Sequence, residues 1–155
     1  MIISSEGSNK FKIKCKEGTI FVSDNIKIND FEISGPGEYE IGGISVERID
    51  DISIICSEDM TLVFLNSNKP LKDKELEKVE ETDILFMPFG EIIDQKVSME
   101  LSNQIEPKVL IPTRYKSIED MKKIKDIVPE IVTEYKISKS LLPEERKIIV
   151  INEQK

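Results

Sequence analysis

The strongest constraint on the fold is a period-two alternation of polar and apolar residues that fills the first 65 residues. Side chains alternate between two faces only where the backbone is extended, so such segments predict β-strands with one buried face. Short turn signals such as Glu17-Gly18 and Ser57-Glu58-Asp59 separate the segments, which predicts hairpins between neighbours. The alternating segments are KFKIKC (10–15), TIFVSD (19–24), NIKIND (25–30), FEIS (31–34), EYEIGGISVERI (38–49), DISIIC (51–56) and MTLVFL (60–65).

The pattern changes after residue 65. Continuous apolar runs at 83–88 (DILFMP) and 108–112 (KVLIP) are typical of strands that are buried on both faces. Three helices are expected near these runs, the first over 72–79. A second helix follows Asp94, places Val97, Leu101 and Ile105 on one face and stops at Pro107. A third opens with the capping pattern SIED (117–120), carries Met121, Ile124 and Val128 on one face and ends before Pro129.

Late strands are expected at 131–137 (IVTEYKI) and 147–151 (KIIVI). No change of composition suggests a linker, and 155 residues are enough for one domain with a single sizeable core. We therefore predict one α+β domain over residues 1–155. Its β-rich half spans 1–65 and its α/β half spans 66–155.

Charge and composition exclude several classes of protein. With 30 acidic and 22 basic residues the net charge is −8, which opposes the phosphate contacts that nucleic-acid binding needs. No apolar run approaches the roughly 20 residues of a membrane span, and the N-terminus does not resemble a signal peptide. We expect a cytoplasmic protein that binds neither nucleic acid nor membrane.

The chain has no histidine and only two cysteines, Cys15 and Cys56. Ser-His-Asp and Cys-His catalysis are thereby excluded, and two cysteines cannot form a Cys₄ zinc site. Each cysteine continues the apolar face of an alternating segment, so we expect both to be small buried hydrophobic residues.

The segment GPGEYEIGG (35–43) could cradle a phosphate or form a corner between strands. A phosphate loop leads into a helix, whereas this one leads into another strand and lacks the lysine of a P-loop. We interpret Gly35-Pro36-Gly37 as a turn, and Gly42-Gly43 as a bulge or a close backbone approach within a strand. Glu38 and Glu40 share one strand face. An exposed acidic edge is the favoured interpretation, and a cation site is the alternative.

Four segments in this order, GPGEYEIGGISV, MTLVFLNSN, ELEKVEETDILFMPFG and IEPKVLIPTRY, resemble a bacterial branch of the metallo-β-lactamase superfamily. This branch contains stand-alone proteins that are predicted to be zinc-dependent hydrolases. The resemblance extends over about residues 31–116 and more loosely over the first hairpin. It implies a sandwich of two mostly antiparallel or mixed sheets, truncated here, with helices on the C-terminal half.

The departures from the family pattern concern its metal ligands. The family's His-x-His-x-Asp-His stretch has no counterpart before FEIS. By the resemblance, Phe64 stands where a ligand histidine belongs, Ser67 where a bridging aspartate belongs, and Arg114 where the last histidine belongs. Zn²⁺ prefers imidazole, thiolate or carboxylate ligands, so we expect no metal, no cofactor and no catalytic residue of the hydrolase type.

Asn66, Ser67, Arg114 and Tyr115 would face one another in a vestigial pocket. Arg114 could bind a carboxylate or phosphate there, but the favoured interpretation pairs it with a nearby acid and leaves the pocket filled. A Mg²⁺ or Ca²⁺ site from Asp24, Asp30 and Glu38 has no supporting spacing.

In the family, helices cover the outer faces of both sheets, and by the resemblance the helix that accompanies the missing His-x-His-x-Asp-His stretch is deleted here. Its loss should leave sheet surface bare, which predicts a homodimer or a protein partner on the N-terminal sheet. Alternatively, the outer side of these strands is polar enough to face water. We expect either a non-catalytic interaction or assembly module, or a residual hydrolase or anion-binding protein that uses the Arg114 pocket.

Overall fold

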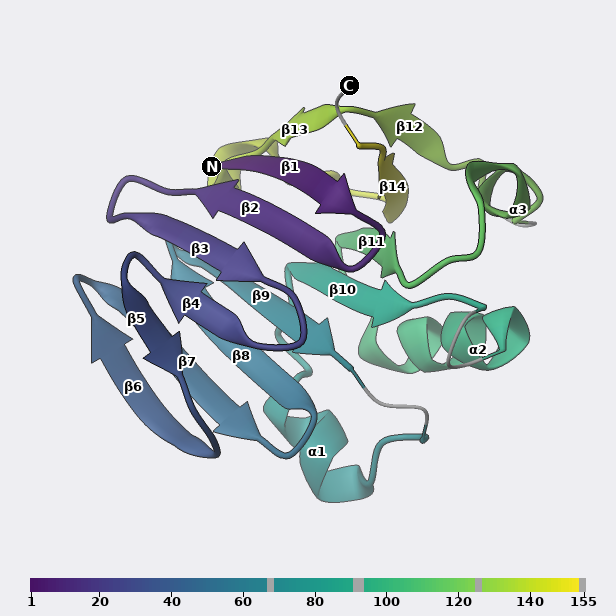
Figure 1. Cartoon of the computed structure of the whole chain (residues 1–155). Helices are drawn as coiled ribbons and strands as arrows, with labels where there is room; N and C mark the ends of the chain where they lie inside the picture. Colours follow the sequence, from purple (N-terminus) through teal and green to yellow (C-terminus); the bar gives the residue numbers. More distant parts are fainter. Residues whose placement is uncertain (67–68, 91–93, 125–126, 154–155) are drawn as a thin grey trace.

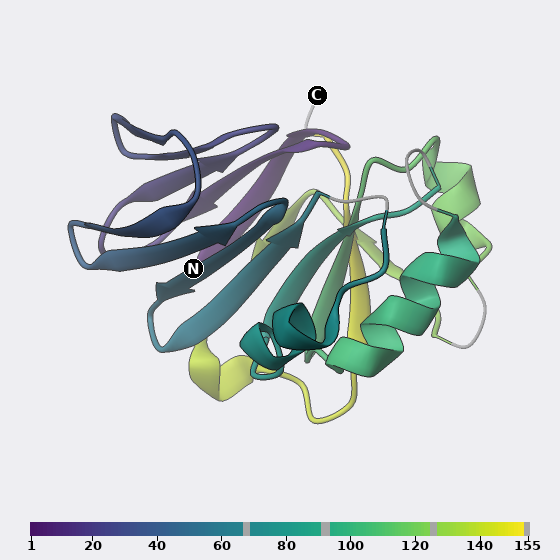
Figure 2. The same ribbon diagram turned by 90° about the horizontal axis from the view of Figure 1, so that it is seen from below.

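The computed structural model describes residues 1–66, 69–90, 94–124 and 127–153. Two β-sheets pack face to face, and the three α-helices lie on the far side of the larger sheet (Figures 1 and 2). This α+β sandwich, with helices supplied by the C-terminal half, confirms the predicted fold class. Among the described residues no helix is long and apolar enough to cross a membrane.

The smaller sheet, here called the N-terminal sheet, is antiparallel throughout and has the order β13-β1-β2-β3-β4-β5. Five of its strands are consecutive in the sequence, because short turns join the alternating segments. The sixth, β13, comes from the C-terminal half. The strands of the N-terminal sheet are β1 (Ile2–Gly7), β2 (Lys10–Lys14), β3 (Thr19–Val22), β4 (Ile26–Ile28), β5 (Phe31–Ile33) and β13 (Glu134–Lys136).

The larger sheet is mixed and has the order β12-β14-β11-β10-β9-β8-β7-β6. The meander from β6 to β9 is antiparallel, whereas β9, β10, β11, β14 and β12 run parallel to one another. Its strands are β6 (Gly37–Ile41), β7 (Ile44–Ile49), β8 (Ile52–Ser57), β9 (Met60–Leu65), β10 (Ile84–Pro88), β11 (Val109–Thr113), β12 (Glu130–Val132) and β14 (Lys147–Ile151).

The helices are α1 (Asp73–Lys78), α2 (Gln95–Ile105) and α3 (Ile118–Lys122), with a 3₁₀ turn η1 (Lys139–Leu141). Asp94 caps α2 by accepting a hydrogen bond from the Lys96 amide at 2.8 Å, as predicted. The third helix is shorter than predicted: α3 ends at Lys122, and the Val128 side chain is 90% exposed instead of buried.

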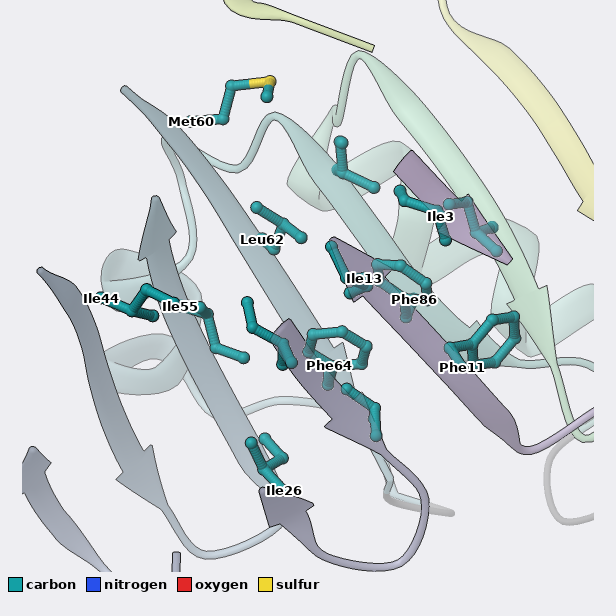
Figure 3. Close-up of a cluster of buried hydrophobic side chains, with 14 of the residues drawn as sticks. Ile3, Phe11, Ile13, Ile26, Ile44, Ile55, Met60, Leu62, Phe64 and Phe86 are labelled. Atoms are coloured by element: carbon teal, nitrogen blue, oxygen red, sulfur yellow. The ribbon is translucent and has the colours of Figure 1, made fainter. Parts of the chain in front are cut away.

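Alternation along the strands divides the core into two layers. In β10, Ile84 and Phe86 point between the sheets, and Leu85 and Met87 point toward the helices. Figure 3 shows the layer between the sheets, where Phe86 lies beside Phe11 and Phe64. A strand that is buried on both faces explains the unbroken apolar run that the sequence displays there.

The glycine-rich segment is a corner, as predicted. Gly35 and Gly37, with φ of 131° and 143°, carry the chain from β5 at the edge of one sheet to β6 at the edge of the other. The bulge interpretation of Gly42-Gly43 is wrong. These residues, with φ of 58° and 93°, form the two-residue turn between the paired Ile41 and Ile44.

Two further expectations need correction. The predicted strand 131–137 is two strands, β12 and β13, which join different sheets. Cys15 is half-buried, but Cys56 is exposed instead of buried, because it lies on the part of β8 beyond the cover of the helices. Glu38 and Glu40 are exposed on the edge strand β6, as expected.

The outer face of the N-terminal sheet is covered by none of the described helices (Figures 1 and 2). Inward residues such as Ile13 and Ile20 are fully buried, whereas most outward residues of this sheet as a whole are lysines and glutamates. The uncovered face is therefore not broadly apolar, which agrees with the alternative that this side is polar.

Candidate functional site

The vestigial pocket lies at the carboxyl ends of β9 and β11, where they meet two turns of the N-terminal sheet. Asn66 follows β9 and Arg114 follows β11. In a parallel sheet the carboxyl ends of the strands share one edge, which brings these two residues together across 48 positions of sequence. The sequence correctly placed Asn66 and Arg114 in one site.

The Arg114 guanidinium is the centre of this site. Its Nε donates to the Asn66 side-chain oxygen at 2.8 Å. Its Nη2 donates to the carboxylate of Asp24, in the turn between β3 and β4. The same Asp24 oxygen accepts a hydrogen bond from the Asn9 side chain at 3.1 Å. The guanidinium is thus held by an amide of the larger sheet and a carboxylate of the N-terminal sheet, as the favoured interpretation of the sequence expected.

The Arg114 backbone takes part as well. Its amide donates to the Ser8 carbonyl at 2.8 Å, in the turn between β1 and β2, and its φ is 46°. A left-handed backbone is unfavourable for a residue with a Cβ, and it persists where surrounding contacts hold it in place. Backbone and side chain together connect the end of β11 to two turns of the opposite sheet.

The space beside this cluster is small. A cavity of about 30 Å³ lies between the sheets, lined among others by Asp24, Asp51, Phe64 and Asn66. Such a volume holds about one water molecule, and a phosphate ester or a sugar does not fit in it. Among the described residues, the side chains beside Asn66 and Asp24 therefore leave little space for a ligand.

Phe64 belongs to the core and not to a ligand site. Its ring is 7% exposed and stacks on Phe86, with ring centroids 4.1 Å apart and planes inclined by 17°. The phenyl ring itself offers no lone pair to a metal ion, although one side of it borders the small cavity.

Tyr115 does not join the pocket, which corrects its inclusion among the pocket residues. Its ring packs in the layer between the larger sheet and the helices, and its hydroxyl donates to the Ile151 carbonyl at 3.3 Å. Burial, helped by the charge of Glu153, raises the pKa of Tyr115 above its usual value, so the phenol stays protonated at neutral pH. Ser67, the fourth predicted member, lies outside the described residues.

These side chains do not fit a zinc ion. The chain has no histidine, and the described residues contain no group of three or more His, Cys, Asp or Glu that could hold a metal. The donors beside Arg114 are one amide and one carboxylate, and that carboxylate is bound to the guanidinium, whose charge opposes a cation. The alternative cation site from Asp24, Asp30 and Glu38 does not form either, since these residues make no such group.

Two partners of Arg114 were not expected from the sequence. Asp24 was considered only as a cation ligand, and Ser8 was not singled out at all; the same holds for Asn9, which bonds to Asp24. Asp24 and Arg114 are 90 positions apart, and no local pattern links them. Only a general argument from composition was available: in a chain with more acidic than basic residues, an arginine is expected to form an ion pair with one of the acids.

Comparison with known proteins gives one clear result. No protein-family model matches the chain, and no curated protein matches it either. Among solved structures, it is similar to the crystal structure of a proposed Zn-dependent hydrolase of the metallo-β-lactamase superfamily from Thermotoga maritima. The TM-score is 0.78 at 20% sequence identity, over 97% of this chain and 98% of that chain. Over nearly its whole length, this chain therefore has the metallo-β-lactamase fold.

Proposed function

We propose that this chain is a non-catalytic domain of the metallo-β-lactamase fold that serves as an interaction or assembly module. One observation carries the proposal. Where the resemblance expects the last metal ligand, Arg114 bonds to Asn66 and Asp24 instead. A guanidinium stays protonated at every physiological pH, so the position has a permanent positive charge where the hydrolase would bind a cation.

The chemistry of a hydrolase of this fold depends on the metal. Zn²⁺ lowers the pKa of bound water and polarises the scissile carbonyl or phosphoryl group. Neither the amide of Asn66 nor the ring of Phe64 supplies such an effect. The chain also lacks histidine, the usual general base near neutral pH. The polypeptide would retain the scaffold of the enzyme without its reaction.

A residual hydrolase or anion-binding protein is the second candidate. The description of the Thermotoga maritima protein as a proposed hydrolase favours it. The Arg114 side chain is 19% exposed, so part of the guanidinium can be reached from solvent. Against this candidate, the adjoining cavity is about 30 Å³ and Asp24 already neutralises the guanidinium.

Metal content and thermal shift together test the proposal. We expect elemental analysis to find far less than one Zn, Fe or Mn per chain. A panel of Zn²⁺, Mn²⁺, phosphate, nucleotides and phosphosugars should leave Tm unchanged, because no ligand binds the folded state. One stoichiometric metal, or a shift of several degrees with one ligand that Arg114→Ala abolishes, would establish the second candidate.

A hydrolase assay with a matched variant completes the test. We expect no turnover of phosphodiester, lactam or thioester substrates above that of Arg114→Ala, purified in parallel. Turnover that co-purifies with the wild-type chain and is lost in Arg114→Ala would contradict a non-catalytic role.

A further inference from the structure

The outward face of the N-terminal sheet has a distinct chemistry. Since Phe11, Ile13, Ile20 and Ile28 point inward, their strand neighbours point outward. Four of these neighbours are lysines, with Phe21 near the middle, and Lys136 of β13 adds a fifth lysine at the edge of the same face. We call this surface the lysine face: Lys10, Lys12, Lys14, Lys27, Lys136 and Phe21.

The strand register sets the centre of the lysine face. Phe21 pairs with Lys12 on one side and with Lys27 on the other. The Lys12 ammonium lies 5.8 Å from the centroid of the Phe21 ring, and that ring is 36% exposed. Neighbouring strands are about 4.8 Å apart, so two cations flank an accessible aromatic ring over about 10 Å.

These cations form no ion pair with a described carboxylate, although Lys27 lies opposite Glu32 in the pairing of β4 with β5. Within the part of the chain that the structure describes, none of the five lysines forms an ion pair. The glutamates at this surface number four against five lysines: Glu6, Glu32 and Glu134 point outward from the sheet, and Glu153 lies beside β1. In a chain of net charge −8, this uncovered face therefore carries a positive excess.

The face is also hollowed beside β1. A depression of about 390 Å³ is lined by Lys12 and Lys14 and by three glutamates, Glu6, Glu134 and Glu153, with Ile2 and two serines. Because its carboxylates outnumber its lysines, an acidic segment would bind beside this depression, over Lys12, Phe21 and Lys27.

We propose that the lysine face binds an acidic segment of a partner protein; this rests on the interaction role proposed above and names its surface. In an extended acidic segment, alternate side chains point the same way about 7 Å apart, which lets two carboxylates reach Lys12 and Lys27. The side chain between these two carboxylates points away from the face, and charge complementarity would set the orientation of the segment.

Other occupants fit less well. A second copy docked face to face would oppose two positive surfaces, which costs free energy. Nucleic acid and anionic membranes extend well beyond this face, so their charge would also meet the acidic remainder of the chain. A short acidic protein segment contacts the lysines alone.

The test measures binding of a synthetic decapeptide of alternating glutamate and leucine to the full chain, by fluorescence anisotropy and by amide chemical-shift changes in NMR. The double variant Lys12→Glu/Lys27→Glu reverses the charge of the two central lysines. Lys74→Glu/Lys123→Glu, at exposed helix-side lysines, is the matched control with the same net charge. We expect amide shifts centred on β2, β3 and β4, about tenfold weaker binding in the first variant and less than twofold in the control.

Added salt should weaken binding to the wild type. Absence of binding, shifts centred elsewhere, or equal losses in both variants would overturn the proposal. So would tighter binding to single-stranded DNA or to phosphatidylserine vesicles than to the peptide. If the peptide does not bind, the metal content and turnover that test the non-catalytic role keep their meaning. If a metal is found at Arg114, the peptide measurement keeps its meaning as well, so each proposal can fail without the other.

Discussion

Arg114 combines an unfavourable backbone with three favourable contacts. Its φ of 46° lies in the left-handed region, while its amide and guanidinium bond to Ser8, Asn66 and Asp24. Because the Asp24 side chain is 79% exposed, solvent screens that ion pair, and the bond to Asn66 is the stronger contributor. The residue therefore joins the two sheets at the cost of some backbone strain.

Comparing two substitutions at Arg114 separates strain from contact. Arg114→Ala loses the side-chain bonds and keeps the strained backbone, so we expect the free energy of unfolding to fall by about 1–2 kcal/mol. Arg114→Gly loses the same bonds but relieves the strain, and should be more stable than Arg114→Ala by about 1 kcal/mol. Urea denaturation measures both, and equal values for the two variants would contradict the strain.

The two cysteines should differ in reactivity. Burial, together with the charges of Glu58 and Glu17, raises the pKa of the half-buried Cys15 thiol above its ordinary value, although a hydrogen bond with Ser57 opposes this. The thiolate is the reactive form, so the exposed Cys56 should be alkylated by iodoacetamide first at pH 8, by about tenfold or more. Mass spectrometry of Cys15→Ser and Cys56→Ser checks this. Faster loss of the thiol in Cys56→Ser than in Cys15→Ser would contradict it.

Among the elements, α2 has the clearest sequence signals at its two ends. Asp94 caps its start, and Glu106 at its end has a φ of 54°, with its amide bonded to the Ser102 carbonyl at 2.8 Å. Left-handed residues end many helices, usually as glycine. The sequence predicted the helix because Asp94, the apolar spacing and Pro107 all agree.

The end of α3 was not predicted from the sequence, since Ile124 and Val128 continue a helical spacing that the backbone does not follow.

Glycine at the end of α2 should stabilise the protein. Glu106→Gly removes the cost of a Cβ in the left-handed region, and we expect a gain of about 0.5–1 kcal/mol in thermal or urea unfolding. Glu106→Ala keeps the Cβ and should change stability much less. A loss of stability in Glu106→Gly would show that the glutamate side chain itself contributes at this position.

At the scale of the whole molecule, the two sheets are held by one apolar layer. Phe86 is fully buried near its centre, with its ring 5.2 Å from that of Phe11 and 4.1 Å from that of Phe64. These three rings come from both sheets, so the layer and not any single hairpin stabilises the sandwich.

Truncation of Phe86 tests this statement. Phe86→Ala should lower the free energy of unfolding by about 3–5 kcal/mol, because it opens a cavity between the sheets. Phe31→Ala, at a ring that is 49% exposed on an edge strand, should cost about 1 kcal/mol or less. Urea titration of both variants gives the comparison, and similar losses would contradict a core centred on Phe86.

Much of the fold was predictable from local pattern. Strand alternation, hairpin turns and buried apolar runs depend on neighbours within a few residues, and they predicted most strands, although not β1. The arrangement of two sheets was an implication of the family resemblance. The division of 131–137 between two sheets was not predictable, because a single continuous apolar pattern satisfies both strands. The burial of Cys56 was mispredicted for a similar reason: alternation tells which face a residue points to, but not whether a helix covers that face.

The sequence by itself determined that this chain has no imidazole and that its first half is antiparallel strand. Only the tertiary structure decided that Arg114 bonds to Asp24 and Asn66, that Tyr115 faces the other layer, and that five lysines without an ion pair to a described residue share one uncovered face. The reason is range. Composition and periodicity are properties of short segments, whereas a contact between residues 90 positions apart exists only once the sheets have packed.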